Sequence, residues 1–62
     1  MIELKDLIMI VDSSTNIKLT FYDAEIYSGT FGNATLDVVS RYLDLEVKEI
    51  YLRDGTLIIR VQ

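Results

Sequence analysis

Aspartates are the main side chains in this sequence that could support acid–base catalysis or bind a metal, because its 62 residues include no histidine and no cysteine. Nucleophilic catalysis of the Ser-His-Asp or Cys-His kind needs a base that titrates near neutral pH, and the chain offers none. A pair of carboxylates could still serve a glycosidase or a metal site. The candidates are Asp12, Asp23, Asp37, Asp44 and Asp54. Each falls in a predicted turn, helix start or link, where Asp is favoured for backbone reasons, so we predict no enzymatic activity and no cofactor.

Two short segments have some features of ligand-binding loops. The run from Asp12 to Asn16 places several oxygen ligands close together, but it lacks the central glycine and the final glutamate of a calcium loop. The segment from Gly29 to Asn33 precedes a predicted helix and could present backbone N–H groups to a phosphate. It has neither the lysine nor the glycine spacing of a Walker loop. The sequence favours an ordinary loop for the first segment and a strand end followed by a helix cap for the second.

The elements that must position any site are clearest in residues 47–61. Two β-rich runs flank Asp54-Gly55, a dipeptide that tolerates the positive φ angles of a type I′ turn. A two-residue loop fixes the register, and the opposite charges of Glu49 and Arg60 support it. The predicted pairs are Leu52 with Leu57, Ile50 with Ile59 and Lys48 with Val61 on one face, and Tyr51 with Ile58, Glu49 with Arg60 and Arg53 with Thr56 on the other.

A second hairpin is predicted earlier in the chain. Residues 17–22 alternate between apolar and polar side chains, and residues 25–31 continue as a second strand after a tight turn at Asp23-Ala24. This register sets Phe21 opposite Ile26 on the inner side and turns Tyr22 and Tyr27 outward. Gly29 is predicted to form a bulge that rotates the following residues back toward the core.

Two helices complete the predicted fold. Apolar spacing from Leu4 to Val11 predicts a helix over residues 3–10, although the same residues would also suit a strand. Residues 34–43 form an amphipathic pattern with Asn33 as the N-cap, and Thr35 is the alternative cap. The fold class is therefore α+β, a four-stranded antiparallel sheet in the order α-β-β-α-β-β with both helices on one face. If the first segment is a strand, the order becomes β-β-β-α-β-β with one helix.

Length and composition limit what this protein can do. The 62 residues form one small domain, residues 1–62, and a domain of this size buries only about 60% of its unfolded surface. No disulfide or zinc site is available to stabilise it, so self-association is expected. The net charge of -4 has no basic cluster, which disfavours duplex nucleic acid. No apolar run is long enough for a membrane span, and without an export signal we expect a cytoplasmic protein.

The outer face of the predicted sheet is the candidate interaction surface. Tyrosine and arginine together are typical of interface centres, and a small chain benefits from covering such a face. The candidate residues are Tyr22, Tyr27, Tyr51, Arg53, Ile58 and Arg60. The alternative is that strands favour aromatic residues and some always point outward. Tyrosine stacking with Arg53 or Arg60 on a phosphate would also suit a small nucleotide shared between subunits.

Three segments give the chain a resemblance to known proteins. They are Leu4-Lys5-Asp6-Leu7 with the polar loop after it, the alternating strand that ends in Tyr22-Asp23, and Val47 to Tyr51 followed by Asp54-Gly55-Thr56-Leu57. In pattern and size the chain resembles the short proteins encoded by bacteriophages and prophages. The resemblance implies a small cytoplasmic accessory protein, and such phage proteins include inhibitors of bacterial immunity and proteins that sequester a nucleotide signal. It assigns no functional residues.

These observations favour a non-enzymatic binding module. We expect it to self-associate and to inhibit or titrate a partner protein, which the phage resemblance implies is a host protein of immunity. The alternative function is a sponge that sequesters a small nucleotide between subunits.

Overall fold

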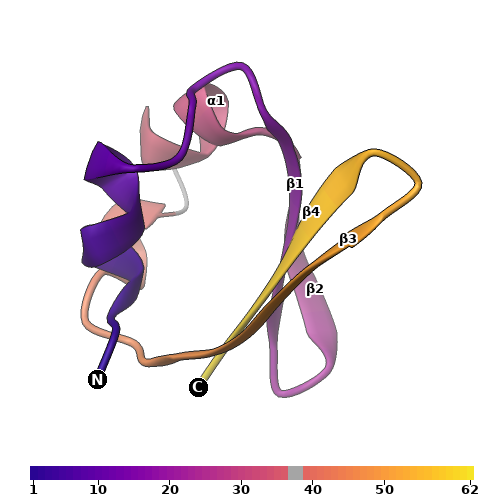
Figure 1. Cartoon of the computed structure of the whole chain (residues 1–62). Helices are drawn as coiled ribbons and strands as arrows, with labels where there is room; N and C mark the ends of the chain where they lie inside the picture. Colours follow the sequence, from indigo (N-terminus) through magenta and orange to yellow (C-terminus); the bar gives the residue numbers. More distant parts are fainter. Residues whose placement is uncertain (37–38) are drawn as a thin grey trace.

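The computed structural model, which describes residues 1–36 and 39–62, has a layer of short helical segments against one face of a twisted sheet (Figure 1). The first helix and both hairpins lie close to their predicted positions, whereas the second helix begins earlier than predicted. The helical segments are η1 (Leu4–Met9), α1 (Phe31–Leu36) and η2 (Val39–Arg41), and the strands are β1 (Asn16–Phe21), β2 (Ala24–Thr30), β3 (Val47–Arg53) and β4 (Thr56–Val61). The α+β class is therefore confirmed.

The sheet is mixed, and the prediction of a wholly antiparallel sheet is wrong. Its strand order is β2-β1-β4-β3, and the two central strands β1 and β4 run parallel. Each hairpin is antiparallel, as local turn chemistry requires. The two hairpins are joined by the pairing of β1, the first strand of one, with β4, the last strand of the other. The sequence pattern within each hairpin does not specify this long-range pairing. As a result β2 and β3 form the two edges of the sheet.

The C-terminal hairpin has the predicted register. Leu52 lies opposite Leu57, Ile50 opposite Ile59 and Tyr51 opposite Ile58, while Glu49 and Arg60 form the predicted charged pair. Asp54 and Gly55 have φ angles of 52° and 80°, as a type I′ turn needs. The prediction fails only at Lys48, because a register shift between Val47 and Glu49 places Val47 opposite Val61.

The N-terminal hairpin turns one residue earlier than predicted. Tyr22 and Asp23 have φ angles of 50° and 69° and form the turn, so Phe21 pairs with Ala24. The register then shifts between Leu19 and Thr20, which leaves Ile26 as the extra residue of β2. The predicted turn at Asp23-Ala24 and the predicted bulge at Gly29 are both wrong.

The first helix is present, but its geometry is 3₁₀. Leu4 and Leu7, three residues apart, are both buried, as the three-residue turn of a 3₁₀-helix requires. The backbone N–H of Glu3 donates to Asp6 Oδ2 at 2.9 Å and closes the start of the segment. Residues 2–3 also contact the beginning of β3, since the N–H of Val47 donates to the carbonyl of Ile2 at 2.8 Å. The alternative first strand is limited to a single bridge between Glu3 and Glu46.

The predicted second helix begins three residues earlier than expected. Helix α1 starts at Phe31, so Asn33 lies inside it and is not its N-cap. The backbone N–H groups of Phe31 and Gly32 donate to the carbonyls of Thr15 and Ser13 at 2.9 and 2.8 Å. Asp37 and Val38 of the predicted helix lie outside the described residues.

The core lies between the helical layer and the inner face of the two central strands. Its fully buried members are Leu4, Leu7, Ile17, Leu19, Phe31, Ala34, Ile59 and Val61. The solvent-accessible surface is 4039 Å², close to the value of about 4,100 Å² that the mass of the chain predicts for a folded monomer. The total surface area is thus that of an ordinary folded monomer. A candidate functional site must therefore be sought in the kinds of side chain that are exposed.

Candidate interaction surface

Four of the six predicted interface residues lie together on the outer face of the sheet, away from the helical layer. Tyr51 lies opposite Ile58, and Arg60 follows two residues after Ile58 on β4. The guanidinium of Arg53 stands 5.5 Å from the centroid of the Tyr51 ring, a cation–π distance. Ile58 is only 6% exposed, so it supports this face from beneath and offers little area to a partner.

Tyr27 and Tyr22 do not join this group, and the predicted outward orientation of Tyr27 is wrong. Tyr27 lies opposite the buried Leu19, on the helix side of the sheet, because the extra residue Ile26 shifts the register. Its hydroxyl donates to the carbonyl of Thr30 at 2.6 Å. Tyr22 sits in the turn, 66% exposed, with its ring edge-on to Phe21 at 4.6 Å between centroids.

Ion pairs cover much of the outer face. Arg60 Nη1 donates to Glu49 Oε1 at 2.8 Å, and Arg60 Nη2 lies 4.0 Å from Asp23 Oδ1. Hydrogen bonding and charge from Glu49 raise the pKa of Arg60 above its ordinary value. Lys18 pairs with Glu25 at 3.6 Å further along the same face. The guanidinium of Arg60 is thus already paired with carboxylates of the same chain. Of the two arginines considered as phosphate ligands, Arg53 is therefore the better placed.

The larger exposed apolar side chains lie on the opposite side of the sheet. Ile50 and Leu52 of β3 share a face with the core residues, yet they are 41% and 72% exposed. The twisted β3–β4 hairpin projects beyond the helical layer, which is too short to cover its tip (Figure 1). The end of η1 exposes three more, Ile8, Met9 and Ile10. We call these five residues the exposed apolar surface: Ile8, Met9, Ile10, Ile50 and Leu52.

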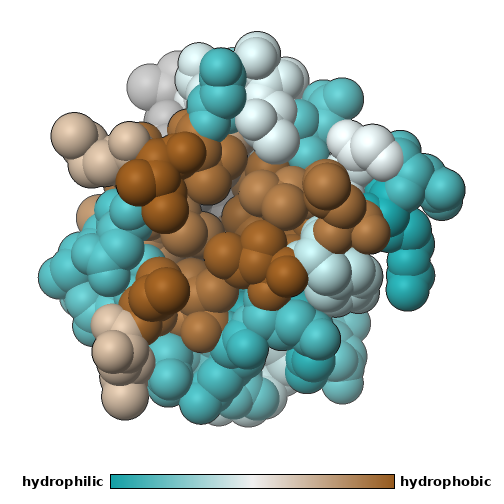
Figure 2. Space-filling model, in the orientation of Figure 1, coloured by the Kyte–Doolittle hydropathy of each residue, from teal (hydrophilic) through white to brown (hydrophobic). Residues whose placement is uncertain are grey.

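Figure 2 shows hydrophobic surface gathered in the middle of one face, between η1 and the β3–β4 hairpin, with hydrophilic residues around it. Contiguous exposed apolar surface with a polar rim is typical of interaction sites. Sequence reasoning missed it because Ile50 and Leu52 have the correct alternation for the core. The available signal was the shortness of the predicted helices, which cannot cover the inner face of four strands.

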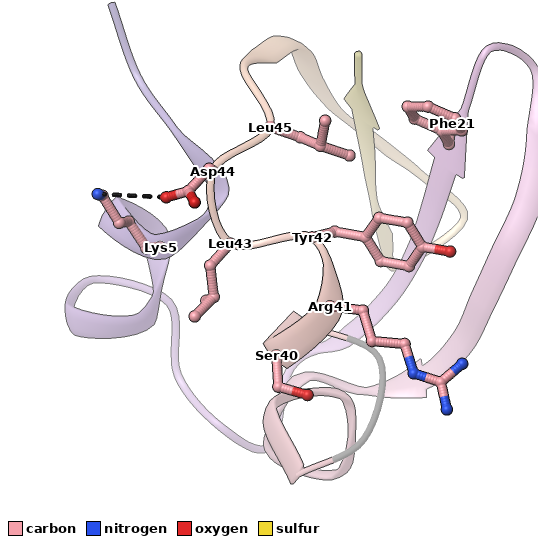
Figure 3. Close-up of a pocket in the computed structure, with 8 residues that line it drawn as sticks. All are labelled: Lys5, Phe21, Ser40, Arg41, Tyr42, Leu43, Asp44 and Leu45. Atoms are coloured by element: carbon pink, nitrogen blue, oxygen red, sulfur yellow. Dashed lines mark hydrogen bonds and ion pairs between the residues drawn. The ribbon is translucent and has the colours of Figure 1, made fainter.

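A pocket of about 540 Å³ lies where η1 and the segment after η2 meet the end of β1 (Figure 3). The rings of Phe21 and Tyr42 stand 6.0 Å apart in it. Lys5 Nζ lies at its rim, 3.5 Å from Asp44 Oδ1 and 3.1 Å from Glu3 Oε1. Hydrogen bonding and charge from Glu3, then from Asp44, raise the pKa of Lys5. Aromatic walls with cations at the rim suit a small planar anion.

Asp12, Asp23 and Asp54, three of the aspartates considered for chemistry, have structural positions, while Asp37 lies outside the described residues. Asp12 Oδ1 accepts hydrogen bonds from the backbone N–H and the hydroxyl of Ser14, at 2.8 and 2.7 Å, and these bonds lower the pKa of Asp12. Asp23 and Asp54 lie in the two hairpin turns. Within residues 1–36 and 39–62, no three acidic side chains stand close enough together to hold a metal ion. The first two N–H groups of α1 donate to carbonyls of the loop, so they are not available to a phosphate, a ligand that the sequence already disfavours there.

Comparisons with known proteins add no assignment. No protein-family model, no curated protein and no solved structure matches this chain. Among the helices of the described residues, none is long and apolar enough to cross a membrane. The candidate sites are therefore assigned on geometry alone.

Proposed function

We propose that this protein is a non-enzymatic binding module that self-associates and inhibits or titrates a partner protein. The observation that carries the proposal is the exposed apolar surface, above all Leu52, which is 72% exposed on the face of the sheet that elsewhere forms the core. Leaving such side chains in water is unfavourable by about 25 cal/mol per Å² of apolar area. Contact with another protein removes that cost.

The two parts of the exposed apolar surface suit different contacts. Ile50 and Leu52 belong to an edge strand, where backbone groups as well as side chains are available for pairing. Ile8, Met9 and Ile10 project from the end of a short helical segment, and the flexible methionine adapts to the shape of a partner. We therefore assign self-association to β3 and the partner protein to the end of η1.

The biological setting of this proposal comes from the resemblance to phage proteins. A cytoplasmic counter-defence protein that blocks a host immunity protein needs a binding surface and no catalytic group. The exposed apolar surface supplies the former, and the absence of histidine and cysteine agrees with the latter.

Native mass spectrometry of the protein purified from its host tests the proposal. We expect more than one subunit together with a partner protein at fixed stoichiometry. Ile10→Lys should release the partner while the subunit count stays, since this charge falls only on the η1 part of the surface. The control Asn16→Lys adds the same charge to an exposed residue at the start of β1, opposite the uncharged Thr30, and should change neither. A single copy with no partner at every concentration would refute the proposal.

A nucleotide sponge is the second candidate, and the aromatic pocket of Figure 3 favours it. A base could lie beside Phe21 and Tyr42, with its phosphate toward Arg41, which also lines the pocket. Thermal-shift measurements against cyclic and linear nucleotides test this function, because a bound ligand stabilises the folded state by mass action. An unchanged melting temperature across the panel would remove it.

A further inference from the structure

The outer edge of β3 is open over most of its length. β3 is the last strand of the sheet, and the N-terminal segment contacts only its beginning, through Val47 and the bridge between Glu3 and Glu46. Residues 49–53 therefore form an edge without a neighbouring strand in the part of the chain that the structure describes. The register shift at Lys48 lies at the covered beginning of β3, and residues 49–53 contain no proline. The charged residues of this open part, Glu49 and Arg53, have opposite signs, and Ile50 and Leu52 lie on one face between them.

The turn determines which backbone groups point toward this open side. The two residues that flank a two-residue hairpin turn form a hydrogen-bonded pair. Moving away from the turn, non-hydrogen-bonded and hydrogen-bonded pairs then alternate along the two strands. Arg53 pairs with Thr56, so Arg53 and Tyr51 direct their backbone N–H and C=O groups toward β4. Ile50 and Leu52, which alternate with them, direct theirs toward the open edge.

We propose that two copies of this chain pair along β3, antiparallel, about a two-fold axis at Tyr51, and so form one continuous eight-stranded sheet. In this register Ile50 lies opposite Leu52 of the partner subunit and forms the hydrogen-bonded pair. Tyr51 lies opposite Tyr51 of the partner subunit. Glu49 lies opposite Arg53 of the partner subunit. The pairing rests on the proposed self-association and specifies its geometry.

Side-chain chemistry selects this register over its neighbours. The core-facing sides of the two copies must lie on the same side of the joint sheet. The two-fold axis can therefore pass only through a residue, and the neighbouring registers are those centred one residue earlier or later along β3. A centre at Ile50 would place Glu49 opposite Tyr51 of the partner subunit. A centre at Leu52 would place Tyr51 opposite Arg53 of the partner subunit. Only the centre at Tyr51 matches apolar with apolar and acid with base.

The pairing also extends contacts that already exist within one chain. On the outer face, Glu49 already binds Arg60 at 2.8 Å and would lie between two guanidinium groups. On the inner face, the row of Leu19, Ile59 and Ile50 would continue into the partner subunit. The contact involves only a few residues of each copy, so we expect a reversible dimer whose population rises with protein concentration.

A single cysteine at the two-fold axis tests the geometry, because the natural chain has none. Residues opposite one another in a non-hydrogen-bonded antiparallel pair have Cα atoms about 4.5 Å apart, which is within the range of a disulfide. Tyr51→Cys should convert most of the protein to a covalent dimer under mild oxidation. Thr20→Cys, on the same outer face but on a central strand, should stay monomeric. Equal cross-linking of both variants would show face-to-face packing and overturn the edge pairing.

Charge exchange tests the register. Glu49→Arg and Arg53→Glu each place like charges opposite one another in a dimer, and each variant alone should lose dimerisation. An equimolar mixture should restore it as a heterodimer, because both charge pairs are then complementary. Glu25→Arg and Lys18→Glu make the same charge changes away from β3 and should dimerise like the natural chain. Circular dichroism establishes that each variant is folded.

The outcomes separate the pairing from the function it rests on. If the natural chain self-associates while Tyr51→Cys fails to cross-link and the charge variants remain dimeric, the edge pairing is overturned and self-association stands. If the natural chain is a single copy at all concentrations, both are overturned. Recovery of the heterodimer from two monomeric variants supports both.

Discussion

Replacing Ile59 by alanine is expected to leave most of the protein unfolded at physiological temperature. Ile59 is fully buried on the central strand β4, between Leu19 and Ile50. Truncating a buried isoleucine to alanine costs about 2–5 kcal/mol. A single core of this size rarely supplies more than about 3–5 kcal/mol in total. Thermal and urea unfolding followed by circular dichroism measure the loss.

Ile50→Ala is the matched control for this substitution. Ile50 lies directly opposite Ile59 on the same face, but 41% of it is exposed, so its truncation leaves a much smaller cavity. We expect Ile50→Ala to fold with a melting temperature close to that of the natural chain at low protein concentration. Equal destabilisation by the two substitutions would mean that the hairpin tip is covered in the monomer and would contradict the exposed apolar surface.

Ile58→Asp is also expected to abolish folding, although Ile58 lies on the outer face of the sheet. It is 6% exposed and lies between Lys18 and Tyr51 on the neighbouring strands. Aspartate is too short to reach water from this position, and the substitution removes apolar burial as well as adding a charge. The combined cost should exceed about 3 kcal/mol. Loss of the circular dichroism signal and of two-state urea unfolding would report it.

Ser28→Asp provides the comparison on the same face. Ser28 is exposed and lies opposite Lys18, so a carboxylate there gains an opposite charge and remains in water. We expect this variant to unfold at the same urea concentration as the natural chain. A folded Ile58→Asp protein would show that the outer face is more open than the structure indicates. Ile58 would then again be a candidate for direct contact with a partner.

The C-terminal hairpin was predictable from sequence because all of its determinants are local. Asp54-Gly55 fixes the turn, and the turn fixes the pairing of Leu52 with Leu57. The burial of Leu4 and Leu7 was likewise predictable from their spacing. Of the candidate site, sequence placed Tyr51, Arg53, Ile58 and Arg60 correctly on one face for the same reason.

The other features depend on contacts between distant segments. Tyr22 and Asp23 both adopt positive φ angles, which neither residue type signals as strongly as Asp-Gly does. The extra residue Ile26, which follows this earlier turn, then places Tyr27 on the helix side of the sheet. The parallel pairing of β1 with β4 is set by the packing of both hairpins beneath the helical layer. Leu52 is exposed because the helical layer does not extend over the tip of the β3–β4 hairpin. The alternation of apolar and polar residues along β3 does not predict how far the helical layer extends.

Hydrogen exchange of single backbone amides at several protein concentrations tests the central claim most directly. The amides of Tyr51 and Arg53 face β4 and should be protected at every concentration, because they are bonded within the hairpin. The amides of Ile50 and Leu52 face the open edge and should exchange rapidly in dilute protein, then become protected as the concentration rises. Rapid exchange at Ile50 and Leu52 at all concentrations would contradict self-association through β3.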